Sequence, residues 1–318
     1  MKSSKILKES CVQIEEKQNI LKNNLVKQAS NVINKKEVKK QTYSQVKLLG
    51  EGSYGKAFLV KCSSDNSYAV IKTLSLNSMT EEAKKEAYKE AKILEKLDHS
   101  NIIRFIEVFR SNRPYPTLNI VMEYADGGDL NKLIKLQQKE KSYFPEDKIL
   151  DWFCQICLAV KHLHDKKVLH RDLKSGNIFL TKGGLVKLGD FGISKNLDNT
   201  MDKAKTVIGT PYYLSPEIIM NKPYSFQSDI WSLGVLLYEI CLLKMPFDAK
   251  SMPMLTLKII KGEYTNLPDV FSKDIRDIIK WILVVDPKKR PKIDDLLSKL
   301  INIYINVYNR KQYYKKKN

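Results

Sequence analysis

Long hydrophobic runs, cysteine and arginine are all scarce in this chain of 318 residues. The longest apolar run, Ile230 to Leu243, is interrupted by Glu239 and is shorter than the roughly 20 residues that a transmembrane helix needs. The first ten residues, MKSSKILKES, lack the apolar stretch of a secretory signal. We therefore expect a globular, cytoplasmic protein with no transmembrane segment.

The five cysteines are an odd number spread thinly along the chain, which is typical of reduced thiols in an intracellular protein. Cys154 and Cys157 form a C-x-x-C pair, but they lie within the helical pattern DWFCQICLAVKHLH and have no second pair to complete a metal site. The pattern favours two small core residues on adjacent turns over a pair of metal ligands.

Positive charge dominates the chain, with a net charge of +19, yet only seven of its 55 basic residues are arginine. Arginine is the residue that reads bases and phosphates in a bidentate way, so its scarcity argues against specific nucleic-acid binding. Residues 1–42 carry +6 and residues 301–318 carry +5, which leaves +8 for the body between them. We expect a basic N-terminal extension over 1–42, helical or disordered, and a basic C-terminal tail over 301–318.

The pattern from Tyr43 onward predicts an α+β fold with two lobes. The runs YSQVKLLG, KAFLVKC and SYAVIKTL are separated by turn residues, as in successive antiparallel strands. A helix is expected from Thr80 to Leu97, with Thr80 as its N-cap and acidic residues in its first turn. Two more strand-like runs follow, and the chain then becomes mainly helical. We predict an N-lobe over about 43–124 (antiparallel sheet plus one helix) and a C-lobe over about 125–300.

A glycine-rich segment, LGEGSYGKA over residues 49–57, is the first chemical signal. Alone, G-x-G-x-x-G is weak, because a tight turn can require glycines for backbone reasons only. A dinucleotide-binding fold would continue into a helix, whereas this segment continues into the strand KAFLVKC. That context predicts a hairpin whose backbone N–H groups approach nucleotide phosphates.

Lys72 ends the strand run AVIK, seventeen residues after Gly55. Most lysines at such a place are solvated, but the preceding glycine hairpin favours contact with the α- and β-phosphates of a nucleotide. A carboxylate from the following helix would hold the ammonium group. Glu90 is the preferred partner because Ile93 and the residues that follow place it beside the apolar face, and Glu86, one turn earlier, is the competitor.

The strongest signal is HRDLKSGN over residues 170–177, followed by KLGDFG over residues 187–192. Phosphoryl transfer depends on charge placed against the triphosphate and on an acceptor for the hydroxyl proton. Asp172 supplies the acceptor and Lys174 contacts the γ-phosphate, while Asn177 and Asp190 offer the oxygen ligands that Mg²⁺ requires. Together with the glycine hairpin and Lys72, these motifs predict an ATP- and Mg²⁺-dependent phosphotransferase.

With these motifs the chain resembles eukaryotic protein kinases from about Tyr43 to about Leu300. Within that superfamily it resembles the NIMA-related (Nek) serine/threonine kinases, through DWFCQICLA at 151–159, NIFLT at 177–181, GTPYYLSPE at 209–217, NKPY at 221–224 and SDIWSLG at 228–234. The resemblance implies a bilobal kinase fold and phosphate transfer to Ser and Thr of protein substrates. It also implies a link to the cell cycle, and to microtubules, centrosomes or cilia.

The resemblance also assigns roles to residues that line the nucleotide site. Met122 corresponds to the gatekeeper, Glu123–Ala125 to the hinge that hydrogen-bonds adenine, and Val70 and Phe179 to the residues that sandwich the ring. The nucleotide-binding set that we expect is Leu49, Gly50, Gly52, Gly55, Ala57, Val70, Lys72, Met122, Glu123, Ala125 and Phe179.

Other roles implied by the resemblance are structural and regulatory. Glu217 is expected to pair with Arg290, Asp229 to hold the backbone of the catalytic loop, and Thr210 to contact Asp172 and Lys174 from the substrate-docking segment. Thr206 matches the autophosphorylation position of the family, where its phosphate would dock on Arg171. The alternative is that the Thr206 hydroxyl is simply exposed in a loop.

Two other classes of function compete with an active kinase. A catalytically weak scaffold with a kinase fold usually lacks Lys72, Asp172 or Asp190, and all three are present. A microtubule-binding adaptor, whose basic ends contact acidic tubulin tails, is compatible with kinase activity rather than opposed to it. The simpler interpretation is that the lysines at the two ends are only solvated and bind no partner.

Overall fold

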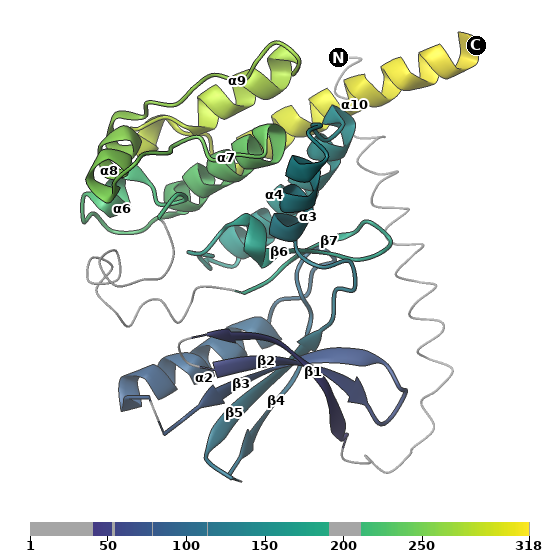
Figure 1. Cartoon of the computed structure of the whole chain (residues 1–318), viewed down its shortest axis with the longest axis vertical. Helices are drawn as coiled ribbons and strands as arrows, with labels where there is room; N and C mark the ends of the chain where they lie inside the picture. Colours follow the sequence, from purple (N-terminus) through teal and green to yellow (C-terminus); the bar gives the residue numbers. More distant parts are fainter. Residues whose placement is uncertain (1–40, 53–54, 78, 113, 191–210, 318) are drawn as a thin grey trace.

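The computed structural model of the chain describes residues 41–52, 55–77, 79–112, 114–190 and 211–317 (Figure 1). A twisted antiparallel sheet with one helix forms the smaller lobe, and helices form most of the larger lobe (Figure 1). The predicted α+β class and its two-lobed arrangement are confirmed. Among the described residues, no helix is both long enough and apolar enough to cross a bilayer.

The sheet of the N-lobe has the strand order β1-β2-β3-β5-β4. Its strands are β1 (Tyr43–Gly52), β2 (Gly55–Cys62), β3 (Tyr68–Ser75), β4 (Phe105–Ser111) and β5 (Thr117–Glu123). The glycine-rich segment supplies the end of β1 and the start of β2, where Gly52 pairs with Gly55, so the expected strand after the glycines is confirmed. At Gly55 a Cβ atom would lie 2.1 Å from the Thr73 carbonyl oxygen, so this position admits only glycine.

Helix α2 (Glu81–Glu95) covers the sheet, as predicted. The Thr80 hydroxyl accepts a hydrogen bond from the N–H of Ala83, which caps the helix, and Glu81 and Glu82 lie in the first turn where the helix dipole favours negative charge. Its buried face carries Ala87, Ala91 and Leu94. The small side chains let the helix lie close to the sheet.

The C-lobe is built around α7 (Phe226–Leu242), whose residues from Ser228 to Leu242 are all buried. The other elements are α3 (Leu130–Lys139), α4 (Glu146–Asp165), the 3₁₀ turn η1 (Ser175–Asn177), β6 (Ile178–Leu180), β7 (Val186–Leu188), α6 (Pro216–Ile219), α8 (Met252–Lys261), α9 (Lys273–Ile282), the 3₁₀ turn η3 (Pro287–Lys289) and α10 (Ile293–Lys317). Cys154 and Cys157 both lie in α4, within the predicted helix. Helix α10 runs past residue 300 and projects beyond α4 (Figure 1).

The β6–β7 hairpin lies where the two lobes meet (Figure 1). Three backbone hydrogen bonds fix it there: Ile103 N–H donates to the Leu188 carbonyl, Leu188 N–H to the Asn101 carbonyl, and Gly127 N–H to the Leu180 carbonyl. Because η1 precedes this hairpin and Gly189 and Asp190 follow it, the hairpin sets the positions of η1 and of Asp190 relative to the sheet.

Candidate active site

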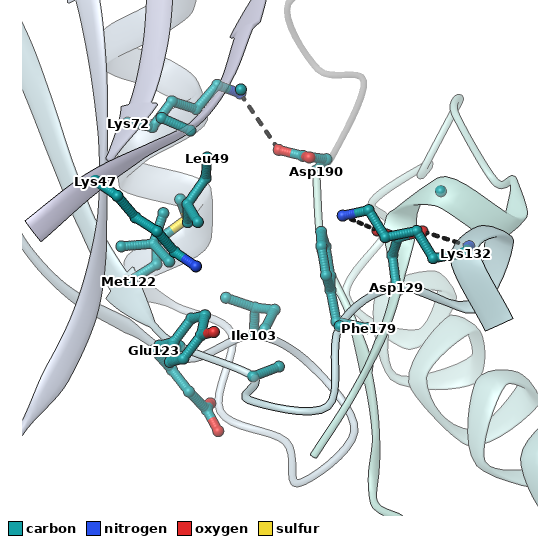
Figure 2. Close-up of a pocket in the computed structure, with 18 residues that line it drawn as sticks. Lys47, Leu49, Lys72, Ile103, Met122, Glu123, Asp129, Lys132, Phe179 and Asp190 are labelled. Carbon is teal, nitrogen blue, oxygen red and sulfur yellow. Dashed lines mark hydrogen bonds and ion pairs between the residues drawn. The ribbon is translucent and has the colours of Figure 1, made fainter. Parts of the chain in front are cut away.

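A cavity of about 390 Å³ opens between the two lobes (Figure 2). Nine residues of the expected nucleotide-binding set line it: Leu49, Gly50, Ala57, Val70, Lys72, Met122, Glu123, Ala125 and Phe179. Asp190, which was expected as a metal ligand, lines it too. Gly52 and Gly55 lie in the β1–β2 hairpin but not in the cavity lining. The volume falls within the range of pockets that hold a ligand the size of a nucleotide.

Side chains of opposite lobes form the apolar walls of the cavity. Val70 on β3 and Phe179 on β6 both line it, and Figure 2 shows Phe179 and Ile103 bordering the same space. Gly189 explains how closely they pack, because a Cβ atom at that position would lie 2.9 Å from a Phe179 ring carbon and 3.0 Å from Ile103 Cγ1. Val70 and Phe179 give the cavity apolar walls from opposite lobes, and we call the space between them the apolar slot, which suits a flat ring.

Glu123, at the end of β5, anchors the edge of the cavity to the larger lobe. Its carboxylate lies 2.7 Å from the Nζ atom of Lys187 on β7 and accepts a hydrogen bond from the Arg104 N–H at 2.9 Å. Lys187 is buried, so this ion pair is shielded from solvent. The carboxylate thus holds the segment that follows β5 against the β6–β7 hairpin.

Polar groups converge around Asp172, on a loop whose residue Gly176 lines the cavity. Lys174 Nζ lies 2.9 Å from Asp172 Oδ2, and the amide of Asn177 donates to the same oxygen at 2.9 Å and to the Asp172 carbonyl at 2.8 Å. The Asp172 carboxylate is half-buried and is held by hydrogen bonds from Asn177 and from the charged Lys174. It lies where an incoming hydroxyl group could donate a proton to it.

Lys72 and Asp190 approach each other across the cavity, with Nζ 3.7 Å from Oδ1 (Figure 2). Asp190 has φ of +49°, a left-handed conformation that is uncommon for a residue with a side chain and that concentrates at functional sites. Glu90 and Glu86 both lie in α2. Their side chains are outside the described part of the structure, so the choice of Glu90 over Glu86 as the partner of Lys72 stays a prediction.

Asp229, buried in α7, holds the backbone of the loop that carries Asp172, which is the expected catalytic loop. Its carboxylate accepts hydrogen bonds from the N–H groups of His170 and Arg171 at 3.0 and 3.1 Å, from the Tyr224 hydroxyl at 2.6 Å, and from His164 Nε2 at 2.9 Å. Burial alone would raise its pKa, but these donors hold the pKa of Asp229 below its ordinary value. Arg171, whose φ is +67°, is thereby kept in a strained conformation.

His170 is fully buried, and desolvation lowers its pKa below the ordinary value. Its two ring nitrogens have different partners: Nδ1 accepts from the Asp172 N–H at 3.2 Å, and Nε2 lies 3.2 Å from the Gly189 carbonyl. A neutral ring with its proton on Nε2 satisfies both contacts. His170 thus links the residue before Asp190 to Asp172.

Glu217 and Arg290 form a bidentate ion pair in the interior of the larger lobe, with both N–O distances at 2.8 Å. Desolvation opposes the ionised carboxylate, but the hydrogen bonds and charge of Arg290 outweigh it and lower the pKa of Glu217. Glu217 is the second residue of α6, and Ser215 joins that helix to the segment from Pro211 to Leu214. The pair therefore fastens the end of that segment to the loop before α10.

Two of the predicted residues, Thr206 and Thr210, lie outside the described part of the chain. Arg171, the residue expected to receive a phosphate, is described, and its guanidinium carbon lies 5.9 Å from the centre of the Tyr224 ring. The expected roles of Thr206 and Thr210 stay predictions.

Several residues of the cavity were not predicted from the sequence: Lys47, Ile103, Gly128, Asp129, Lys132, Gly176 and Gly189. Tyr124, which also lines the cavity, lies within the predicted hinge Glu123–Ala125. Lys47 lies two residues before the glycine-rich segment, and strand alternation gave a signal that it shares a face with Leu49. Asp129 caps α3 by accepting from the Lys132 N–H and also pairs with Lys132 Nζ at 2.9 Å. Nothing in the local sequence placed Ile103 beside Phe179, since that contact depends on how the lobes meet.

The donor atoms at Asn177 and Asp190 fit a hard divalent cation. Asn177 uses its amide nitrogen to hold Asp172, so its oxygen Oδ1 is the atom that it can offer to a metal ion. Within the described ranges, no group of three or more His, Cys, Asp or Glu side chains could hold a metal by itself. One amide oxygen and one carboxylate suit Mg²⁺, which is usually bound by one or two protein oxygens together with substrate phosphates.

The sequence profile described as "Protein kinase domain" matches residues 43–300. Mouse serine/threonine-protein kinase Nek1 is 48% identical over 259 residues, which cover 81% of this chain and 21% of that protein. Human serine/threonine-protein kinase Nek5 is 47% identical over 258 residues, covering 81% of this chain and 36% of that protein.

A probable serine/threonine-protein kinase of Dictyostelium discoideum, nek3, is 45% identical over 270 residues, covering 83% of this chain and 24% of that protein. These relatives are considerably longer than the present chain, which spans between about a fifth and two fifths of their length. The similarity therefore concerns the kinase domain rather than the whole of any relative.

Proposed function

Because the chain belongs to the protein kinase domain family, with a kinase domain of the NIMA-related (Nek) type, we propose that it transfers the γ-phosphate of ATP to Ser and Thr hydroxyls of proteins. One observation carries the proposal most directly. Lys72 and Asp190 lie 3.7 Å apart in the cavity lining, and Asn177 links Asp190 to Asp172, since its amide nitrogen lies 3.4 Å from the Asp190 carbonyl oxygen and 2.9 Å from Asp172 Oδ2. These groups form the polar end of the site, and Val70 and Phe179 form its apolar slot. A nucleotide with its ring in the slot would direct its phosphates toward this polar end.

Each polar group has a chemical task suited to its position. Asp172 accepts the proton of the attacking hydroxyl, which its half-buried carboxylate can do without leaving its hydrogen bonds to Asn177. Lys174 and Lys72 place positive charge where negative charge accumulates on the transferred phosphoryl group. Asn177 and Asp190 would hold Mg²⁺, which when bound neutralises phosphate charge and orients the triphosphate.

Regulation by phosphorylation is proposed at Thr206, with Arg171 as the residue that receives the phosphate. The support is that Arg171 lies beside Asp172 on a loop whose backbone is fixed by Asp229, so a phosphate bound there would act directly on the catalytic loop. Thr206→Ala should lower activity, and Thr200→Ala serves as the matched control. Full activity of Thr206→Ala, with another residue phosphorylated in the active enzyme, would refute the proposal.

Transfer of labelled phosphate from Mg²⁺-ATP to a casein-type substrate tests the proposed activity. We expect labelled Ser and Thr in the acid hydrolysate, little labelled Tyr, and no transfer when the metal is chelated. If the wild-type chain phosphorylated at Thr206 transfers no phosphate, a scaffold with a kinase fold becomes the better account.

A cytoplasmic location with attachment to microtubules, centrosomes or cilia is the further part of this proposal. Its support is the basic charge of residues 1–42 and 301–318, which suits acidic tubulin tails, and the type of kinase domain. Microtubule pelleting at low and high salt compares the full chain with variants in which the lysines of either segment are replaced by glutamine. Pelleting that is equal for all of them would contradict attachment through these ends.

A further inference from the structure

Three polar side chains from separate parts of the chain meet beside the loop that carries Asp172. They are Ser175 of η1, Tyr213 of the segment before α6, and Glu239 of α7. The Ser175 hydroxyl donates to Glu239 Oε1 at 3.0 Å, and the Tyr213 hydroxyl donates to Glu239 Oε2. The Ser175 N–H in turn donates to the Tyr213 hydroxyl oxygen at 3.2 Å, and the two hydroxyl oxygens lie 3.1 Å apart. Each hydroxyl gives its single hydrogen to Glu239, so the Ser175 N–H closes the ring of hydrogen bonds.

Because Ser175 and Glu239 are buried, breaking their hydrogen bonds would raise the free energy of the folded chain. Ser175 is 3% exposed and Glu239 is 4% exposed, so water cannot readily replace either partner. Both carboxylate oxygens of Glu239 are satisfied by hydroxyl donors, while burial raises the pKa of this carboxyl. Removing one hydroxyl would leave a buried carboxyl oxygen without a donor.

The ring connects the loop that carries Asp172 to the segment Pro211–Leu214, which directly follows Thr210, the residue expected in the substrate-docking segment. Ser175 directly follows Lys174, on the loop that carries Asp172. Tyr213 belongs to the segment Pro211–Leu214, and its carbonyl is held by the Ser232 hydroxyl at 3.0 Å. Helix α7 therefore fixes Tyr213 at two points and fixes the catalytic loop through the same carboxylate.

We propose that Ser175 is a positioning residue for the protein substrate: its hydroxyl and amide set the segment Pro211–Leu214 at a fixed place relative to Asp172. This inference rests on the proposed kinase activity. None of the three side chains is among the residues that line the cavity between the lobes. Loss of the Ser175 hydroxyl therefore weakens use of the substrate peptide and leaves use of ATP unchanged.

Ser215 offers a matched control for Ser175. Both are buried serines, and Ser215 is 2% exposed, but its hydroxyl has no hydrogen-bond partner among the described residues. Ser175→Ala and Ser215→Ala remove the same atom, one from the ring and one from outside it. Tyr213→Phe removes the other hydroxyl of the hydrogen-bond ring and keeps the aromatic side chain.

Steady-state kinetics on the full chain, with KM measured separately for ATP and for an acceptor peptide, tests the inference. For Ser175→Ala we expect the peptide KM to rise by about 5-fold, as for one lost buried hydrogen bond, with the ATP KM unchanged. Ser215→Ala should match the wild type. The double variant Ser175→Ala/Tyr213→Phe should be no worse than Tyr213→Phe alone, because both changes break one network.

The inference is overturned if Ser175→Ala lowers the melting temperature but leaves the peptide KM at the wild-type value. It is also overturned if the peptide and ATP KM values rise together. Should Ser175→Ala fail to fold, the same two criteria apply to Tyr213→Phe. An inactive wild type would instead contradict the proposed kinase activity, so the two failures are distinguishable.

Discussion

Arg290 lies between Glu217 and Trp231, with its guanidinium paired to the carboxylate at 2.8 Å and its central carbon 4.9 Å from the indole ring. The same guanidinium donates to the carbonyls of Val284, Val285 and Gln227. Both charged side chains are almost completely withdrawn from solvent. The end of the segment before α6 is thereby tied to α7 and to the loop before α10.

Replacement of Arg290 by methionine should destabilise the chain strongly. The change leaves the Glu217 carboxylate buried without its partner, and removing one member of a buried pair costs about 3–5 kcal/mol of unfolding free energy. Denaturant unfolding measures the difference. Lys84→Met is the control, because Lys84 pairs with the exposed Glu81 at 2.7 Å and such surface pairs contribute about 0–1 kcal/mol. Equal losses of unfolding free energy for Arg290→Met and Lys84→Met would contradict this account.

The pairing of Glu217 also predicts a dependence of stability on pH. Desolvation opposes but does not cancel the effect of Arg290, so the folded pKa of Glu217 lies below its ordinary value of 4.5. The stabilising contribution is therefore present above that value and is lost as the pH falls through the folded pKa. The gap in unfolding free energy between wild type and Glu217→Gln should narrow toward acid. A gap that stays constant from about pH 7 to about pH 3 would refute the linkage.

Gly189→Ala should impair nucleotide binding. The added Cβ atom would lie 2.9 Å from Phe179 and 3.0 Å from Ile103, so one wall of the slot must shift. We expect the ATP KM to rise by about 10-fold, on the scale of overpacking a tight site, with a smaller change for the peptide. Gly183→Ala is the control, since its Cβ would meet only Thr181 Oγ1 at 3.7 Å. An unchanged ATP KM for Gly189→Ala would show that the slot does not hold the nucleotide ring.

Local patterns were sufficient to predict the strands, the α2 helix and the motif residues. Thr80 and the acids after it signal the helix start through interactions within one turn, and the glycine hairpin is recognisable because a strand follows it. The pair Lys187–Glu123 and the ring formed by Ser175, Tyr213 and Glu239 could not be predicted in this way. Those partners lie between 26 and 64 residues apart, and only the packing of α7 and the β6–β7 hairpin brings them together.

The assignment of phosphate transfer is tested most directly by comparing the wild-type chain with Asp172→Asn and Asp190→Ala in one assay with Mg²⁺-ATP and a casein-type substrate. Asp172→Asn removes the proton acceptor and Asp190→Ala removes an oxygen ligand for the metal. We expect each variant to lose roughly 10²–10⁴-fold in turnover, while ATP still stabilises Asp172→Asn against thermal unfolding. Wild-type turnover in either variant would contradict the assignment of the catalytic centre.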